Sequence, residues 1–264
     1  MTVQSSKSIK LVHPTRYMLI GPPTGGKTHL ACTFPKPFVF DFEDGIPRIG
    51  GAGLEFDYET FDYNRDDAAA DKAKARLMEF SAMKRAGKLP YRTCVIDSLV
   101  AWSNATMASV MRMSKLDKPS QKEFGELANE QEQFKGFAVA TFDYLVIIAH
   151  EEVEKDEVSG ALVAKPLALG KAFSKGLPPY MSEIWFCDSQ IGATGRKFTI
   201  KTVKDTRHPF LRTAVKGMPP VMEDATFEKI AKLGGFWEPA AVAAPAAGAS
   251  VAVPKVATVA TGAK

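Results

Sequence analysis

Apolar runs rich in β-branched and aromatic residues alternate along the chain with longer stretches in which apolar and polar residues are mixed. Each run is bounded by Gly, Pro or Asp, which is the pattern of β-strands. The six predicted strands span residues 16–21, 37–42, 92–98, 144–150, 183–189 and 196–203.

Helical patterns separate most of these strands, and we predict helices over residues 27–34, 66–87, 99–113 and 121–142. Alternating strands and helices favour a parallel sheet with both faces covered, which binds ligands at the carboxyl ends of its strands. The last two strands, separated by QIGATG, are expected to pair as an antiparallel hairpin. The sequence therefore predicts an α/β fold with a mostly parallel central sheet, helices on both faces and a C-terminal antiparallel hairpin.

Composition narrows the class of protein. With 264 residues, of which 45% are hydrophobic and 24% charged, the chain suits one large globular α/β domain over residues 1–238. Residues 239–264 are almost all Ala, Val, Pro and Gly, and we expect a disordered tail there. Two further stretches, 114–120 and 151–180, follow strands but show no clear pattern.

The cysteines and the apolar runs indicate the cellular location that we expect for the protein. Cys32, Cys94 and Cys187 are odd in number and far apart, which suggests neither a disulfide framework nor a zinc site. No run approaches the roughly 20 apolar residues that span a bilayer, and the N-terminus lacks the apolar core of a leader peptide. We therefore expect a cytoplasmic protein without a membrane partner.

Charge is unevenly distributed although the net charge is only +4. Nine acidic residues and two arginines lie between Asp41 and Asp67, and seven basic residues and one aspartate lie between Arg196 and Lys216. Two readings stay open at this point: solvated faces, or, for the basic segment, a binding surface for phosphates.

A phosphate-binding motif follows the first predicted strand. Residues 21–28, GPPTGGKT, match GxxxxGK[ST] between a strand and a helix. Glycines allow several backbone N–H groups to point at one spot, Lys27 would reach the β- and γ-phosphates, and Thr28 would ligate Mg²⁺. The predicted nucleotide contacts are Gly21, Pro22, Thr24, Gly25, Gly26, Lys27, Thr28 and His29.

Acidic residues at two other strand ends complete the predicted site. Asp97 closes an apolar strand and is the expected second Mg²⁺ anchor. Ser98 occupies the next position, where many ATPases place the glutamate that activates water, so that glutamate must come from elsewhere. Glu43 follows the strand 37–42 and is the candidate catalytic base.

His150 ends the strand 144–150, again at the predicted phosphate edge. It is either a structural histidine or a γ-phosphate sensor whose hydrogen bond changes when the terminal phosphate leaves. The glycines and lysines of the next thirty residues predict a mobile, moderately basic segment. A sensor beside such a segment would act as a switch.

Five motifs in this order resemble the RecA-like P-loop ATPases, and most of all the small phage-encoded nucleotide-binding proteins of that superfamily, some of which are single-strand annealing recombinases. The resemblance covers about residues 14 to 215. The motifs are GPPTGGKTHLA, FVFDFEDG, TCVIDSLVAW, LVIIAHEE and RKFTIKTVKDTRHPF.

The resemblance implies ATP and Mg²⁺ as cofactors and a RecA-like ATPase core. It implies that Glu43 activates the attacking water, that Asp97 acts on the Mg²⁺-associated water, and that His150 senses the γ-phosphate. In RecA-type filaments a strand similar to KTVKDTR supplies cations to the neighbouring subunit. Lys204 and Arg207 are then the trans-acting candidates, and a homo-oligomeric ring or filament is expected.

The resemblance also implies single-stranded DNA as a partner and the host cytoplasm as location if the protein is phage-encoded. The family's DNA-binding loops map to residues 113–126 and 151–176, with Phe173 as a stacking group. The lysines expected to contact phosphates are Lys115, Lys118, Lys165, Lys171 and Lys175. Because RecA's flanking DNA-binding domains are lacking, annealing is favoured over full strand exchange.

Two other functions stay open. A small-molecule P-loop kinase would need a lid with clustered arginines, and the basic residues lie on a predicted hairpin instead. An ATP-switched binding module without significant turnover would use the same phosphate site. The sequence does not say whether DNA stimulates hydrolysis or whether a single-strand DNA-binding protein takes part.

Overall fold

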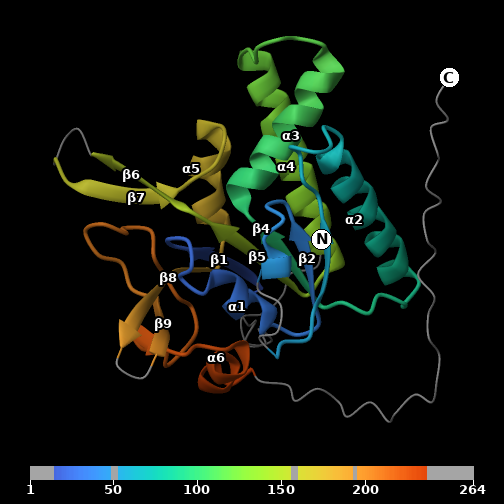
Figure 1. The fold of residues 1–264 in the computed structure, drawn as a ribbon. Coiled ribbons are helices and arrows are strands. Elements are labelled where there is room, and N and C mark those ends of the chain that lie inside the picture. The colour runs from blue at the N-terminus through green and yellow to red at the C-terminus, as the bar shows by residue number, and fades with distance from the viewer. Residues whose placement is uncertain (1–14, 49–52, 156–159, 193–194, 237–264) are drawn as a thin grey trace, which may run out of the picture.

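The computed structural model describes residues 15–48, 53–155, 160–192 and 195–236. Eight strands form its central sheet: β1 Arg16–Ile20, β2 Pro37–Asp41, β3 Asp57–Thr60, β4 Thr93–Asp97, β5 Tyr144–Ala149, β8 Glu183–Gly192, β9 Gly195–Lys201 and β10 Val221–Glu223. Their order across the sheet is β10-β9-β8-β1-β5-β4-β2-β3 (Figure 1). The six strands from β8 to β3 run parallel, whereas β9 runs antiparallel to both of its neighbours, β8 and β10.

Both faces of the sheet are covered by helices. Successive side chains of a strand point to opposite faces, and Tyr17 and Leu19 join one buried cluster while Met18 and Ile20 join the other. Helices α2 to α5 pack on the Met18 face, and α1 and α6 pack on the Tyr17 face. The helices are α1 Lys27–Cys32, α2 Ala69–Arg85, α3 Leu99–Ser114, α4 Gln121–Thr141, α5 Lys171–Tyr180 and α6 Phe227–Gly234.

The structure confirms the predicted fold class and all six predicted strands. Outside the segment 151–180, the sequence pattern does not predict three short elements of the described chain, β3, β10 and α6. β3 has the sequence DYET and lies at the edge of the sheet, where its side chains are exposed or half-buried. It therefore lacks the apolar run by which a buried strand is found.

The described parts of the segment 151–180, residues 151–155 and 160–180, contain strands and a helix that the sequence pattern does not predict. They contain a separate hairpin of β6 (Glu151–Lys155) and β7 (Leu162–Pro166), followed by α5. Figure 1 shows this hairpin projecting from the body of the molecule. The strand β6 reads EEVEK, and α5 contains two prolines near its end, so neither shows a regular apolar period.

Phe173 is one correction to the sequence prediction. Its side chain is only 3% exposed and its ring lies edge-on to that of Trp102, with 5.7 Å between the centroids. Phe173 belongs to the core and is not available to stack on a base. The side chains of Lys171 and Lys175 lie outside the described residues.

The acidic and basic segments lie at opposite ends of the sheet, near β2 and β3 and near β9 and β10. Many of their charges are paired within the chain. The pairs include Arg65 with Asp44 and Asp62, Lys72 with Asp66, Arg76 with Glu59, Arg112 with Asp67, Lys201 with Asp205, and Arg207 with Glu151. Both segments are therefore less strongly charged than the sequence suggests.

The predicted tail, residues 239–264, lies outside the described residues, and the division at residue 238 stays a prediction. Within the described ranges, no helix combines the length and apolar character that crossing a membrane requires.

Candidate nucleotide-binding site

A cavity of about 690 Å³ opens at the carboxyl ends of β1, β2, β4 and β5, the edge predicted from the strand order. It brings together the loop after β1 with Glu43, Asp97 and His150, which come from three other strands. Its lining consists of Pro23, Thr24, Gly25, Gly26, Lys27, Thr28, His29, Glu43, Gly45, Asp97, Ile148, His150, Arg196 and Phe198.

Lys27 is held in a fixed position by the loop that precedes it. Its ammonium donates to the carbonyl oxygens of Gly21 at 2.9 Å and Pro22 at 2.6 Å. Gly21 and Pro22 are both predicted nucleotide contacts. They hold the Lys27 ammonium through their carbonyl oxygens and do not line the cavity. The lysine is buried, and loss of solvation lowers its pKa.

The loop is pressed against the β8–β9 hairpin, which explains two of its glycines. A Cβ on Gly21 would lie 2.1 Å from the carbonyl oxygen of Cys187, and a Cβ on Gly26 would lie 2.4 Å from the ring of Phe198. Gly26 also has a φ of 83°, a conformation that favours glycine. The motif's glycines are thus needed for close packing as well as for curling the backbone.

Thr28 and Asp97, the two predicted Mg²⁺ anchors, meet directly. The Thr28 hydroxyl donates to Oδ2 of Asp97 at 2.7 Å. Burial raises the pKa of Asp97 to about 6, an effect that this hydrogen bond partly offsets. Hydroxyl and carboxylate oxygens are hard ligands that suit Mg²⁺, which typically takes one or two protein oxygens together with substrate phosphates.

Glu43 is positioned by side chains from two neighbouring strands. His150 Nε2 lies 3.2 Å from Oε1 of Glu43, and the Ser98 hydroxyl donates to the same oxygen. The hydrogen bond from His150, together with that from Ser98, lowers the pKa of Glu43 below its usual value. Ser98 therefore holds the glutamate that reaches the site from the adjacent strand.

Asp41 builds the turn that carries Glu43. The side chain is fully buried, its Oδ1 accepts from the backbone N–H of Glu43 and of Gly45 at 3.1 Å each, and its Oδ2 accepts from that of Ile46 at 3.2 Å. Burial raises the pKa of Asp41 even though these three donors oppose the shift. Asp41 is a structural residue that fixes the direction of its neighbour.

Lys204 and Arg207 do not line the cavity. β9 ends at Lys201, two residues before the predicted strand end, and both residues follow in a loop. Lys204 is exposed, and Arg207 pairs with Glu151 at 2.9 Å. In a single chain neither cation faces the phosphate loop.

Two residues missed by the sequence analysis, Arg196 and Phe198, complete the cavity from β9. The rings of Phe198 and His29 are nearly parallel, with 6.0 Å between their centroids. The basic character of the segment was visible in the sequence, but its approach to the phosphate loop depends on the packing of a hairpin far along the chain.

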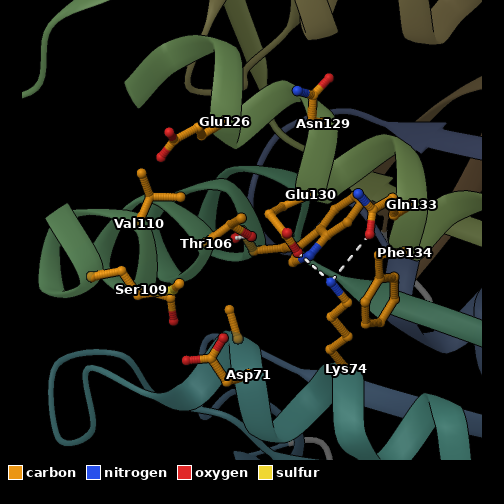
Figure 2. Close-up of a pocket in the computed structure, with 13 residues that line it drawn as sticks. Asp71, Lys74, Thr106, Ser109, Val110, Glu126, Asn129, Glu130, Gln133 and Phe134 are labelled. Atoms are coloured by element: carbon orange, nitrogen blue, oxygen red, sulfur yellow. Dashed lines mark hydrogen bonds and ion pairs between the residues drawn. The ribbon is translucent and has the colours of Figure 1, made fainter. Parts of the chain in front are cut away.

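A second cavity of about 480 Å³ lies between α2, α3 and α4 (Figure 2). Lys74 points from α2 toward α4, where its ammonium lies 2.6 Å from Oε2 of Glu130 and 3.3 Å from Oε1 of Gln133. This pairing ties the two helices together. The cavity contains none of the predicted nucleotide, metal or catalytic residues.

Comparison with known proteins agrees with this geometry. A family model described as an AAA domain matches residues 13–209, which is more than half of the chain and includes β1 to β9. No curated protein matches the chain. On the family match, supported by the strand order and the phosphate loop, the chain belongs to the AAA domain family and carries a P-loop ATPase domain of the AAA type.

Proposed function

We propose that this protein binds and hydrolyses ATP, and that it binds single-stranded DNA and assists phage-type recombination or strand annealing. The observation that carries the ATPase part is one cavity in which Lys27, Asp97 and Glu43 converge. A phosphate-binding cation, a metal-binding carboxylate and a candidate base are the parts that phosphoryl transfer to water requires.

Each residue has a defined role in the proposed reaction. Lys27 binds the β- and γ-phosphates. To do so, its ammonium gives up its hydrogen bonds to the carbonyl oxygens of Gly21 and Pro22. Glu43 accepts a proton from the water that attacks the γ-phosphorus, while the bond to the β–γ bridging oxygen breaks and ADP leaves. Mg²⁺ held by Thr28 and Asp97 would neutralise charge on the phosphates.

His150 links the proposed reaction to the rest of the molecule. It hydrogen-bonds Glu43, and it is followed directly by Glu151, which begins the β6–β7 hairpin. The backbone carbonyl of His150 also accepts from Leu167, just beyond β7. A change at the γ-phosphate would therefore reach the hairpin through one residue, as the proposed sensor role requires.

Phosphate release from ATP, measured with and without single-stranded DNA, tests the proposed ATPase function. No release in either condition contradicts it.

The DNA-binding part of the proposal rests mainly on the turn between α3 and α4. Figure 1 shows this turn at the top of the molecule, away from the central sheet. Lys115 and Lys118 are exposed there, and Leu116 between them is 49% exposed. The β6–β7 hairpin contributes less, because Lys165 is paired with Glu154.

We expect a labelled oligonucleotide to bind at low salt in the presence of a nonhydrolysable ATP analogue. Replacing Lys115 and Lys118 with alanine should weaken binding and reduce the slope of log K against log salt by about 1.4 if both contact phosphates. Arg85→Ala with Lys88→Ala, which removes two exposed cations at the end of α2, is the matched control. Absence of binding with and without the analogue contradicts this part.

We also propose a head-to-tail oligomer. The acidic and basic segments lie at opposite ends of one sheet, and complementary ends generate a ring or filament when copies repeat. Lys204 would then face the neighbour's phosphates. Light scattering with ATP should show an oligomer, and specific activity should rise with protein concentration; a monomer with constant specific activity contradicts it.

A further inference from the structure

The β8–β9 hairpin forms a wall of the nucleotide cavity. Side chains two apart in a strand share a face, and Ile200, Phe198 and Arg196 occupy successive positions on one face of β9. Ile200 is buried in the core, Phe198 packs on Gly26 of the phosphate loop, and Arg196 lines the cavity near the tip of the hairpin. This face of β9 therefore extends from the hydrophobic core at Ile200 to the nucleotide cavity at Arg196.

The charges that line the cavity are nearly balanced. Its described lining contains the carboxylates of Glu43 and Asp97 and the cations of Lys27 and Arg196. Without Arg196 the carboxylates would outnumber the cations, which is unfavourable for a polyphosphate anion. Lys27 alone does not balance the two carboxylates, because it contributes a single positive charge to the described lining.

Arg196 is available for a ligand. Its side chain is exposed, and within the described part of the chain it forms no ion pair or side-chain hydrogen bond. Arg207, one of the two cations predicted from the sequence, is instead held by Glu151 and lies outside the cavity. Guanidinium groups bind phosphate oxygens through several donors in fixed geometry.

We infer that Arg196 is a phosphate-contacting residue supplied by the same subunit whose phosphate loop binds the nucleotide. The inference rests on the proposed function, since it takes the ligand of the cavity to be ATP. It adds a cis-acting cation to the site, beside the trans-acting candidates of the neighbouring subunit.

Displacement of a bound fluorescent ATP analogue by ATP and by inorganic tripolyphosphate tests the contact. Arg196→Ala should weaken both competitors by about tenfold or more, and Arg196→Lys should recover part of the loss. Lys197→Ala is the matched control, because Lys197 is the next residue on β9 and points to the opposite face. Its Nζ lies 3.5 Å from Oε2 of Glu223. The control substitution should change either affinity by less than about twofold.

Two results with the Arg196→Ala variant would overturn the inference while leaving the proposed function intact. Arg196→Ala that behaves like Lys197→Ala shows that the side chain makes no contact. A loss for ATP with unchanged tripolyphosphate affinity shows that it acts on the base or ribose. A wild-type protein that does not bind the ATP analogue contradicts the proposed function itself, and the inference with it.

A mixing experiment tests whether Arg196 acts in cis. Lys27→Ala subunits have a defective phosphate loop but retain Arg196, so they would supply Arg196 to a neighbour if it acted in trans. We expect a mixture of Arg196→Ala and Lys27→Ala subunits to turn over ATP at the summed rates of the two variants measured alone. Recovery toward the wild-type rate would contradict a cis role.

Discussion

We expect Lys27→Ala to abolish ATP turnover, with a loss of at least about 10³-fold, and to weaken ATP binding as well. The ammonium lies inside the loop, where no other described cation is held by the carbonyls of Gly21 and Pro22. Removing one preorganised donor to the transition state typically lowers kcat by about 10² to 10³-fold. Lys27 also binds the phosphates of ATP before the reaction, so its removal weakens ATP binding as well. Phosphate release and calorimetric ATP titration measure the two effects.

The control for this prediction separates chemistry from folding. Lys88→Ala removes an exposed lysine far from the cavity and should leave turnover and binding unchanged. Circular dichroism should show that Lys27→Ala keeps its helices and strands, because the two hydrogen bonds of the Lys27 ammonium in the described part of the chain go to carbonyls of the preceding loop. Near wild-type turnover in a folded Lys27→Ala protein would remove the proposed site.

Glu43→Gln should retain ATP binding and lose about 10² to 10⁴-fold in turnover, the usual contribution of general base catalysis. The glutamine carbonyl oxygen can accept the hydrogen bonds that His150 and Ser98 now give to Oε1 of Glu43. The amide cannot accept the proton of the attacking water. Single-turnover phosphate release, combined with the Kd for ATP, distinguishes a lost base from a lost ligand contact.

Glu55→Gln is the matched control for this change, since Glu55 is an exposed glutamate outside the cavity. Its turnover should equal that of the wild type. If Glu43→Gln hydrolyses ATP at the wild-type rate, another group activates the water. The role of Glu43 would then be to hold His150 through their hydrogen bond.

The parts of the site that lie next to strand ends could be predicted from the sequence. Lys27 is predicted by the GxxxxGK[ST] motif, whereas Glu43, Asp97 and His150 each follow or end an apolar run, and parallel strands bring such ends to one edge. Their convergence in one cavity therefore required only the strand order. The hydrogen bond from Ser98 to Glu43 is consistent with the reasoning that a serine after Asp97 calls for a glutamate from another strand.

The rest of the site depends on contacts that no local pattern encodes. Arg196 and Phe198 reach the cavity because Cys187 and Phe198 pack on glycines of the phosphate loop. The burial of Phe173 depends on the helix α5, whose sequence KAFSKGLPPY contains residues that normally end helices. Periodicity describes one element at a time, and these positions follow from how elements dock.

The packing of the phosphate loop against the second half of the sheet also bears on how the protein is made. The loop emerges from the ribosome early, whereas Cys187 and Phe198, which lie against Gly21 and Gly26, are synthesised much later. Contacts this distant in sequence form late because a long segment must first be closed. A nascent chain that ends before β9 would therefore have the nucleotide motif without the partner that shapes it, and ATP binding should mature only when the carboxyl-terminal hairpin has docked.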